Sequence, residues 1–269
     1  MIGIRFYFGF ASDPNKRIQK IKDYGFDAII TSPDKKYNKQ NTSIKNQVKL
    51  AKENGLKLSS MHSTYKNELL PYFWQPGLKG WLIKRKLIKE ARFAKKLGFA
   101  CMVVHLDGKF SNLGKNRLLQ VLAVAKKIDL PLAIENLTNE DLLIDVFKNI
   151  EHPYLKLCFD AGHNNCFTPN LDVLSMFGKH LVAVHLHDNL GKTDDHTLNL
   201  FGNIDWDAVA KKLANCPPVS LDYELAMYND HDITEDECLE ICIKQGKDLE
   251  FLIEKYRREN LSKVSISFK

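Results

Sequence analysis

The chain has 269 residues, of which 44% are hydrophobic and 27% charged, and its formal net charge is +6. This balance predicts a soluble globular protein with apolar mass enough for one large α/β barrel. No stretch approaches the roughly 20 apolar residues of a membrane span, and no basic leader precedes a long apolar run, so we expect neither a membrane anchor nor a signal peptide. The positive charge is spread over helical segments, which favours a solvated surface over a nucleic-acid stripe.

The cysteine pattern indicates the compartment. The six cysteines show no CxxC spacing, and several lie inside apolar, strand-like runs. Such residues pack as small hydrophobic side chains, so we expect reduced thiols and a cytoplasmic protein rather than a disulfide framework.

Short apolar runs alternate with longer amphipathic, lysine-rich segments along the whole chain. In chain order the pattern predicts strand 3–9, helix 13–24, strand 26–32, helix 44–54, strand 56–63, helix 78–97, strand 99–108, helix 116–128, strand 130–137, helix 140–149, strand 154–163, helix 171–177, strand 181–184, helix 205–214, strand 218–225 and helix 235–259. Eight such units in this length predict a closed (β/α)₈ TIM barrel spanning residues 1–260, followed by a loosely held tail at 261–269.

Two further features support a barrel. The predicted strands are near-continuous runs of Val, Ile, Leu and Phe, as expected of parallel strands that are covered on both faces. No glycine-rich phosphate loop follows the first strand, which argues against dinucleotide-binding and P-loop folds.

Metal-binding side chains gather at the predicted carboxyl ends of the strands, where a barrel carries its active site. Taken singly, each residue also has a structural explanation. A lone His62 or His105 at a strand end is more often a hydrogen-bonded core histidine than a metal ligand, and Asp160 could equally well cap the following turn. Glu224 would be a surface residue if its strand ended early. Their shared placement on one rim favours a site, because the opposite strand ends carry no comparable set. The rim residues are His62, His105, Glu135, Asp160, His163, His185, His187, Asp194, His196, Asp222 and Glu224.

These residues occur in an ordered series of motifs: MHSTY, VVHLDG, AIEN, FDAGH, HLHD and DDH…FGNIDW, followed by SLDYEL. The series resembles the xylose-isomerase-like TIM barrels, which include sugar isomerases and epimerases and the endonuclease IV group (AP endonuclease family 2). The resemblance covers nearly the whole chain. It implies a divalent metal cofactor (Mn, Zn, Mg or Co), one to three ions per chain.

The resemblance implies two alternative ligand sets. In the isomerases one metal would be held by Glu135, Asp160, His185 and an eighth-strand carboxylate, either Asp222 or Glu224. The nuclease group uses nine ligands for a three-zinc cluster, and counterparts of all nine are present. They are His62, His105, Glu135, Asp160, His163, His185, Asp194, His196 and the same eighth-strand carboxylate.

On the isomerase reading, the substrate is a sugar or sugar phosphate that the metal chelates. Glu135 and Glu224 (or Asp222) would move the proton. The residues expected to contact substrate are His163, His187, Tyr65, Trp74 and Lys192. Several epimerases carry an Arg shortly after the seventh-strand His, whereas this chain reads HLHDNLGK, so that role would pass to Lys192 or another residue.

On the nuclease reading, two or three metals would clamp a phosphate of abasic DNA, and nucleic acid would be the partner. This reading assigns a role as metal ligands to His62, His105, Asp194 and His196. Against it, no cluster of Arg and intercalating side chains that could hold bent DNA is evident in the loops. The isomerase reading is therefore preferred, and a barrel that binds without turnover is disfavoured because paired carboxylates would be idle there. Barrels of this kind often pair, so a homodimer is a further expectation.

Overall fold

Eight parallel strands close into a barrel in sequence order. The computed structural model describes residues 1–33, 42–227 and 232–266. Strand β1 pairs with both β2 and β8, which closes the sheet and confirms the predicted (β/α)₈ architecture. The strands are β1 (Ile2–Arg5), β2 (Ala28–Thr31), β3 (Lys57–His62), β4 (Cys101–Val104), β5 (Leu132–Glu135), β6 (Leu155–Asp160), β7 (Leu181–Leu186) and β8 (Leu221–Tyr223).

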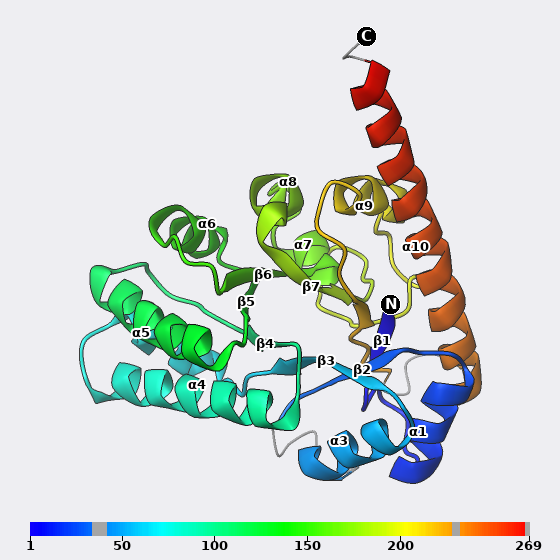
Figure 1. Cartoon of the computed structure of the whole chain (residues 1–269), viewed down its shortest axis with the longest axis horizontal. Coiled ribbons are helices and arrows are strands. Elements are labelled where there is room, and N and C mark those ends of the chain that lie inside the picture. The colour runs from blue at the N-terminus through cyan, green and yellow to red at the C-terminus, as the bar shows by residue number, and fades with distance from the viewer. Residues whose placement is uncertain (34–41, 228–231, 267–269) are drawn as a thin grey trace.

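The helices form the outer layer of the barrel (Figure 1). They are α1 (Pro14–Asp23), α3 (Ile44–Glu53), α4 (Leu78–Leu97), α5 (Asn112–Ile128), α6 (Glu140–Asn149), α7 (Ala161–Phe167), α8 (Val173–Phe177), α9 (Trp206–Leu213) and α10 (Glu235–Ile266), with 3₁₀ segments η1 (Asn67–Trp74) and η2 (Gly178–His180). The short elements α7, η1 and η2 were not predicted. Helix α10 continues through most of the predicted tail, whose last residues, 267–269, lie outside the described residues.

Packing explains why the strands lack the alternation of a half-exposed sheet. Every residue of β2, β4 and β5 is buried, because helices cover one face and the barrel interior fills the other. A cluster of small side chains includes Cys101, Val103 and Cys158, and all six cysteines are unpaired. Within the part of the chain that is described, no helix combines the length and apolar character needed to cross a membrane.

The segment between β3 and α4 is fastened to α5. Arg117 of α5 is buried and donates hydrogen bonds to the carbonyl oxygens of Phe73 and Gln75, each at 2.7 Å. The Trp74 ring packs so closely on Gly114 that an added Cβ there would lie 2.1 Å from the indole. These contacts fix a loop that would otherwise have few partners for its backbone carbonyls.

We expect Arg117→Met to destabilise the fold by about 2–4 kcal/mol, because it leaves buried carbonyl groups without donors. The measurement is the free energy of unfolding from denaturant titration. Arg92→Met, at an exposed position of α4, is the matched control and should change the free energy of unfolding by no more than about 0.5 kcal/mol. Equal effects of the two substitutions would contradict the role of Arg117.

Candidate metal centre

The carboxyl ends of the strands enclose a cavity of about 330 Å³. His62 ends β3, Glu135 ends β5, Asp160 ends β6, and His185 lies one residue before the end of β7. Glu224 follows β8 directly and lines the cavity. Six of the eleven predicted rim residues line this cavity, together with Arg5 and Tyr65, and the other five do not. The six are His62, His105, His163, Asp194, His196 and Glu224.

Three carboxylates converge on one imidazole nitrogen, and one of them, Glu224, lines this cavity. His185 Nδ1 lies 2.7 Å from Glu135 Oε1, 2.8 Å from Glu224 Oε2 and 3.9 Å from Asp160 Oδ2. These four residues, which we call the inner group, come from β5, β6, β7 and the end of β8. Their convergence depends on barrel closure, because β5 and β8 are separated by two intervening strands.

Neighbouring side chains hold the two glutamates in place. Glu135 Oε2 lies 3.1 Å from His62 Nε2 and also contacts His105 Nε2. The ring of Tyr65 packs on His105 at 4.0 Å between centroids. Glu224 Oε1 forms an ion pair with Arg5 at 3.3 Å. These contacts fix one oxygen of each carboxylate, and the other oxygen of each is directed at His185.

Electrostatics keeps these carboxylates charged. Burial opposes ionisation of Glu135, but the adjacent imidazoles of His105, His185 and His62 outweigh it and hold its pKa well below the usual value. For Glu224 burial is likewise outweighed, by His185 and Arg5, and its pKa is also well lowered. The pKa of His185 is raised well above its usual value because nearby Cys158, Glu224 and Glu135 overcome its burial.

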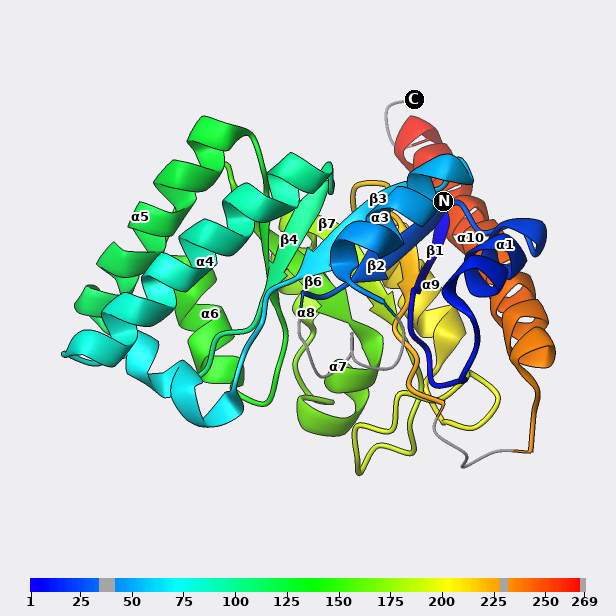
Figure 2. The ribbon, with the colours of Figure 1, turned by 90° about the horizontal axis from the view of Figure 1, so that it is seen from below.

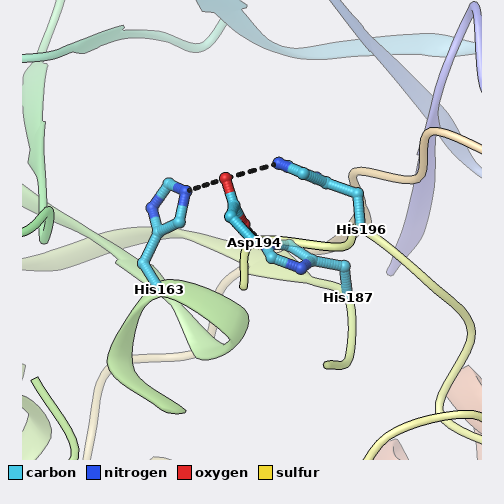
Figure 3. Close-up of side chains that lie close together, drawn as sticks. All are labelled: His163, His187, Asp194 and His196. Carbon is cyan, nitrogen blue, oxygen red and sulfur yellow. Dashed lines mark hydrogen bonds and ion pairs between the residues drawn. The ribbon is translucent and has the colours of Figure 1, made fainter. Parts of the chain in front are cut away.

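A second set of donors, the outer group, lies beside the first and consists of His163, His187, Asp194 and His196 (Figure 3). Asp194 Oδ2 is 3.3 Å from His163 Nε2 and 3.2 Å from His196 Nε2. His187 stacks on His196 with ring centroids 3.9 Å apart. The raised pKa values of His163 (to about 10) and His196 follow from Asp160 and Asp194 overcoming the burial of these imidazoles.

The loop after β7 carries three of the four outer-group residues, His187, Asp194 and His196. Backbone hydrogen bonds between Asp188 and Thr197 close it, and the Asp188 side chain accepts from Trp206 Nε1 at 2.8 Å. His196 has a φ of 50°, an unusual conformation for a side chain other than glycine. Its Nδ1 lies 2.6 Å from the backbone oxygen of Glu224, which ties this loop to the end of β8.

Asp160 serves two purposes at once. Its Oδ1 caps α7 by accepting a hydrogen bond from the backbone N of His163 at 2.7 Å. Its Oδ2 is buried without a hydrogen-bond partner among the described residues. The capping reading and the ligand reading of this residue are therefore compatible.

The structure separates the two eighth-strand carboxylates. Glu224 joins the inner group, whereas Asp222 lies deeper in the barrel and accepts hydrogen bonds from Ser59 Oγ at 2.5 Å and Ser220 Oγ at 2.6 Å. Burial raises the pKa of Asp222. Both side chains point inward, as their spacing predicts, but they occupy different layers of the barrel interior.

Two of the five predicted substrate contacts, Tyr65 and His163, line the cavity, and the other three do not. Trp74 is instead buried against α5, His187 is fully buried beside His196, and Lys192 is exposed on the loop after β7 outside the cavity lining. Trp74 packs over Gly114, where the missing side chain leaves room for the indole. The apolar composition of the loop did not indicate this contact.

Two residues with clear roles were not predicted. Arg5, at the end of β1, pairs with Glu224 and lines the cavity. Asn136 follows β5, and its amide bridges to β6 by accepting from Asp160 N at 2.8 Å and donating to Asp160 O at 2.9 Å. The first strand was predicted over 3–9, which placed Arg5 inside the strand, so the strand-end criterion did not find it; the observed strand ends at Arg5.

The donor sets fit divalent metal ions. In three overlapping groups of residues the candidate ligand atoms lie within 4.8 Å of one another. Asp160 Oδ2 and His187 Nδ1 are buried without hydrogen-bond partners in the part of the chain that is described, whereas His187 Nε2 lies 2.9 Å from Asp160 Oδ1. Carboxylate oxygens combined with imidazole nitrogens suit Mn, Zn, Mg or Co. The three groups whose ligand atoms lie within 4.8 Å of one another are the following: His62, Glu135, His185 and Glu224; Glu135, Asp160 and His163; and the outer group.

Comparisons with known proteins agree with this geometry. The sequence model described as xylose isomerase-like TIM barrel matches residues 18–238. An uncharacterized protein of Sinorhizobium fredii, y4fM, is 27% identical over 236 residues, covering 72% of this chain and 75% of that protein.

Solved structures share the fold. A D-tagatose 3-epimerase-like protein superposes with a TM-score of 0.71 at 19% identity, covering 96% of this chain and 98% of that one. The IolI protein, solved with a zinc atom, gives a TM-score of 0.69 at 18% identity, with 95% and 99% covered. At this identity the likeness establishes the architecture.

Proposed function

Because the chain belongs to the xylose isomerase-like TIM barrel family, we propose that it is a metal-dependent isomerase or epimerase of a sugar or sugar phosphate. The observation that carries the proposal is the convergence of Glu135 and Glu224 on His185 Nδ1 beside the cavity. Isomerisation and epimerisation next to a carbonyl both need one group to remove a proton from carbon and a group to return it. The similarity to the D-tagatose 3-epimerase-like protein supports this class of reaction, and the similarity to IolI, solved with a zinc atom, supports a bound metal.

The two glutamates are suited to carry the proton. In the metal-free chain both have lowered pKa values, so both are carboxylates at neutral pH, the form that accepts a proton, although a lowered pKa also makes each a weaker base. His62 and His105 fix one carboxylate oxygen of Glu135, and Arg5 fixes one of Glu224, which leaves the other oxygen of each directed inward. Fixed orientation of this kind reduces the reorganisation that proton transfer requires.

The inner group of Glu135, Asp160, His185 and Glu224 would hold the metal. A divalent ion there would supply positive charge that stabilises the anion left when the proton is removed. Tyr65 offers an aromatic face at the cavity wall, and Asn67 and Glu68 offer polar contacts at exposed positions of the same wall. The volume of about 330 Å³ is at the small end of ligand sites, which favours a single sugar.

The test combines a metal count with a proton-exchange assay. Protein purified without chelator should contain one Mn, Mg, Co or Zn ion per chain in the inner group. Incubated in D₂O with a panel of aldoses, ketoses and their phosphates, it should place deuterium at the carbon next to the carbonyl of its substrate, as NMR would detect. A metal-loaded protein that exchanges no proton on any sugar would contradict the proposal.

One observation favours a second candidate, a multi-zinc phosphodiesterase acting on abasic DNA. The outer group includes Asp194 and His196, which have no assigned role in a one-metal isomerase but would be metal ligands in a multi-zinc site. Two or three zinc ions per chain together with cleavage of DNA at an abasic site would establish this alternative. A single ion without cleavage would exclude it.

Asp194→Asn separates the two candidates. Asp194 bridges two imidazoles of the outer group and makes no recorded contact with Glu135 or Glu224. If the inner group performs isomerisation, we expect the variant to keep turnover within about tenfold of wild type, whereas loss of a metal ligand should reduce a phosphodiesterase by about 10²-fold or more. The measurement is kcat at saturating metal, and a loss of isomerase activity as large as that of a Glu135 variant would contradict the assignment of the inner group.

A further inference from the structure

Helix α10 extends beyond the barrel that it packs on. Its barrel-facing residues recur every three or four positions, and the last buried one is Ile253. The helix nevertheless continues to Ile266, and its C-terminal part projects away from the other elements in Figure 1. The barrel-facing residues are Cys238, Cys242, Gly246, Leu249 and Ile253.

A second row of residues runs along a solvent-facing side of α10, beside the barrel-facing row. We call Lys247, Phe251, Glu254, Arg258 and Leu261 the outer seam; all are exposed, and their spacing alternates between four and three. Phe251 and Leu261 are each 71% exposed. Alternating spacings of four and three are those of a helix that packs against another helix, so this row is suited to a partner helix.

An apolar hollow adjoins the outer seam. It has a volume of about 480 Å³, and Phe251 and Arg258 form its α10 side. Its other wall consists of Leu213, Pro217, Pro218 and Val219, at the end of α9 and before β8. A partner side chain beside Phe251 would therefore meet apolar surface from two elements.

We propose that a second copy of this chain covers the outer seam, with the two α10 helices packed antiparallel about a two-fold axis. An axis at the level of Tyr256 places Phe251 opposite the partner's Leu261 and Glu254 opposite the partner's Arg258. The symmetry repeats each contact, so two apolar pairs and two ion pairs form. The acidic residue precedes the basic one along the seam, and this order is self-complementary only in the antiparallel arrangement.

The charged side chains of α10 are compatible with a second copy of the chain as the partner. Glu254 Oε1 pairs with Arg257 at 2.6 Å within the chain, so the partner's Arg258 would share this carboxylate; Arg257 also donates to the backbone oxygen of Cys216 at 3.2 Å. Glu250 pairs with the amino group of Met1. For Arg258 no partner is recorded among residues 1–33, 42–227 and 232–262, which leaves its guanidinium available to a carboxylate of another chain.

A rival apolar patch on α4 lacks this complementarity. Leu78 and Leu82 are 67% and 51% exposed, and Trp81 lies between them. Helix α4 lies on the side of the molecule away from α10 in both views (Figure 2). Its charged neighbours are basic, since Arg85 stacks on Trp81 and Lys79 on Tyr72. A symmetric pairing through α4 would bring like charges together.

Sedimentation velocity of the full chain over a wide range of concentration tests the proposal. Wild type should form a dimer, and Leu261→Ala should weaken it. Arg258→Glu should raise the dimer dissociation constant by at least about tenfold, because the two-fold axis creates two pairs of facing carboxylates. The double variant Glu254→Arg/Arg258→Glu exchanges the charges, restores both ion pairs and should return the dissociation constant towards the wild-type value.

Leu82→Glu, on the rival patch, is the matched control and should leave dimerisation unchanged. All these positions are exposed, so circular dichroism should show the same fold in each variant. A wild type that stays monomeric at every concentration, a dimer that Leu82→Glu disrupts, or a charge exchange that restores nothing would each overturn the proposal. None of these outcomes depends on the catalytic activity.

Discussion

Glu135→Gln is expected to reduce turnover by about 10²–10⁴-fold, the range typical of a lost general base. The substitution removes the carboxylate that contacts His62, His105 and His185 and that is expected to accept the substrate proton. Glutamine has nearly the same shape, and its carbonyl oxygen still accepts from a neighbouring imidazole. The fold should therefore persist, as circular dichroism and thermal unfolding would show.

The kinetic effect must be separated from loss of metal. Activity of Glu135→Gln should therefore be measured at saturating metal, with the bound metal counted in the same sample. Glu68→Gln is a matched control, since Glu68 is exposed at the cavity wall and is expected to affect KM rather than kcat. Unchanged turnover in a metal-loaded Glu135→Gln protein would refute the assignment of the inner group.

Metal binding to the metal-free protein is expected to release protons. Imidazoles ligate metals only when neutral, yet the pKa of His163 is raised to about 10, and those of His185 and His196 are also raised. Metal affinity should therefore increase with pH, by about tenfold per pH unit for each proton displaced. Calorimetric titrations in buffers with different ionisation enthalpies would count the protons, and a heat of binding independent of the buffer would contradict the prediction.

The same groups predict how the stability of the metal-free protein depends on pH. A histidine whose pKa is raised on folding contributes stability that is complete below about 6.5 and is lost as the pH approaches about 10. Glu135, Asp194 and Glu224 have lowered pKa values, so their contribution is complete above about 4 and is lost at lower pH. The metal-free protein should therefore be most stable under weakly acidic conditions.

Bound metal should change this profile. Because the metal replaces the protons on the imidazoles, the metal-loaded protein should keep its stability above neutral pH, where the metal-free form loses it. Thermal unfolding midpoints of both forms between about pH 6.5 and about pH 10 would show the difference. Parallel pH profiles for the two forms would contradict proton displacement as its cause.

The order of elements could be predicted from sequence because each element has a local cause. Helices α4 and α6 begin and end where their amphipathic patterns do, and α4 stops at Gly98, which adopts a left-handed conformation. The strands were identified as continuous apolar runs because both of their faces are buried. The short helix α7 was missed because its start depends on the side chain of Asp160, which sequence reasoning assigned to the site.

The sequence by itself determined which residues could form a site, because parallel strands in a barrel bring all their carboxyl ends to one rim. That rule identified Glu135, Asp160 and His185 without knowledge of their distances. The tertiary structure alone decided that Glu224 rather than Asp222 meets His185. Local spacing fixes the face of a strand, whereas depth within the barrel depends on how all eight strands are staggered when the sheet closes.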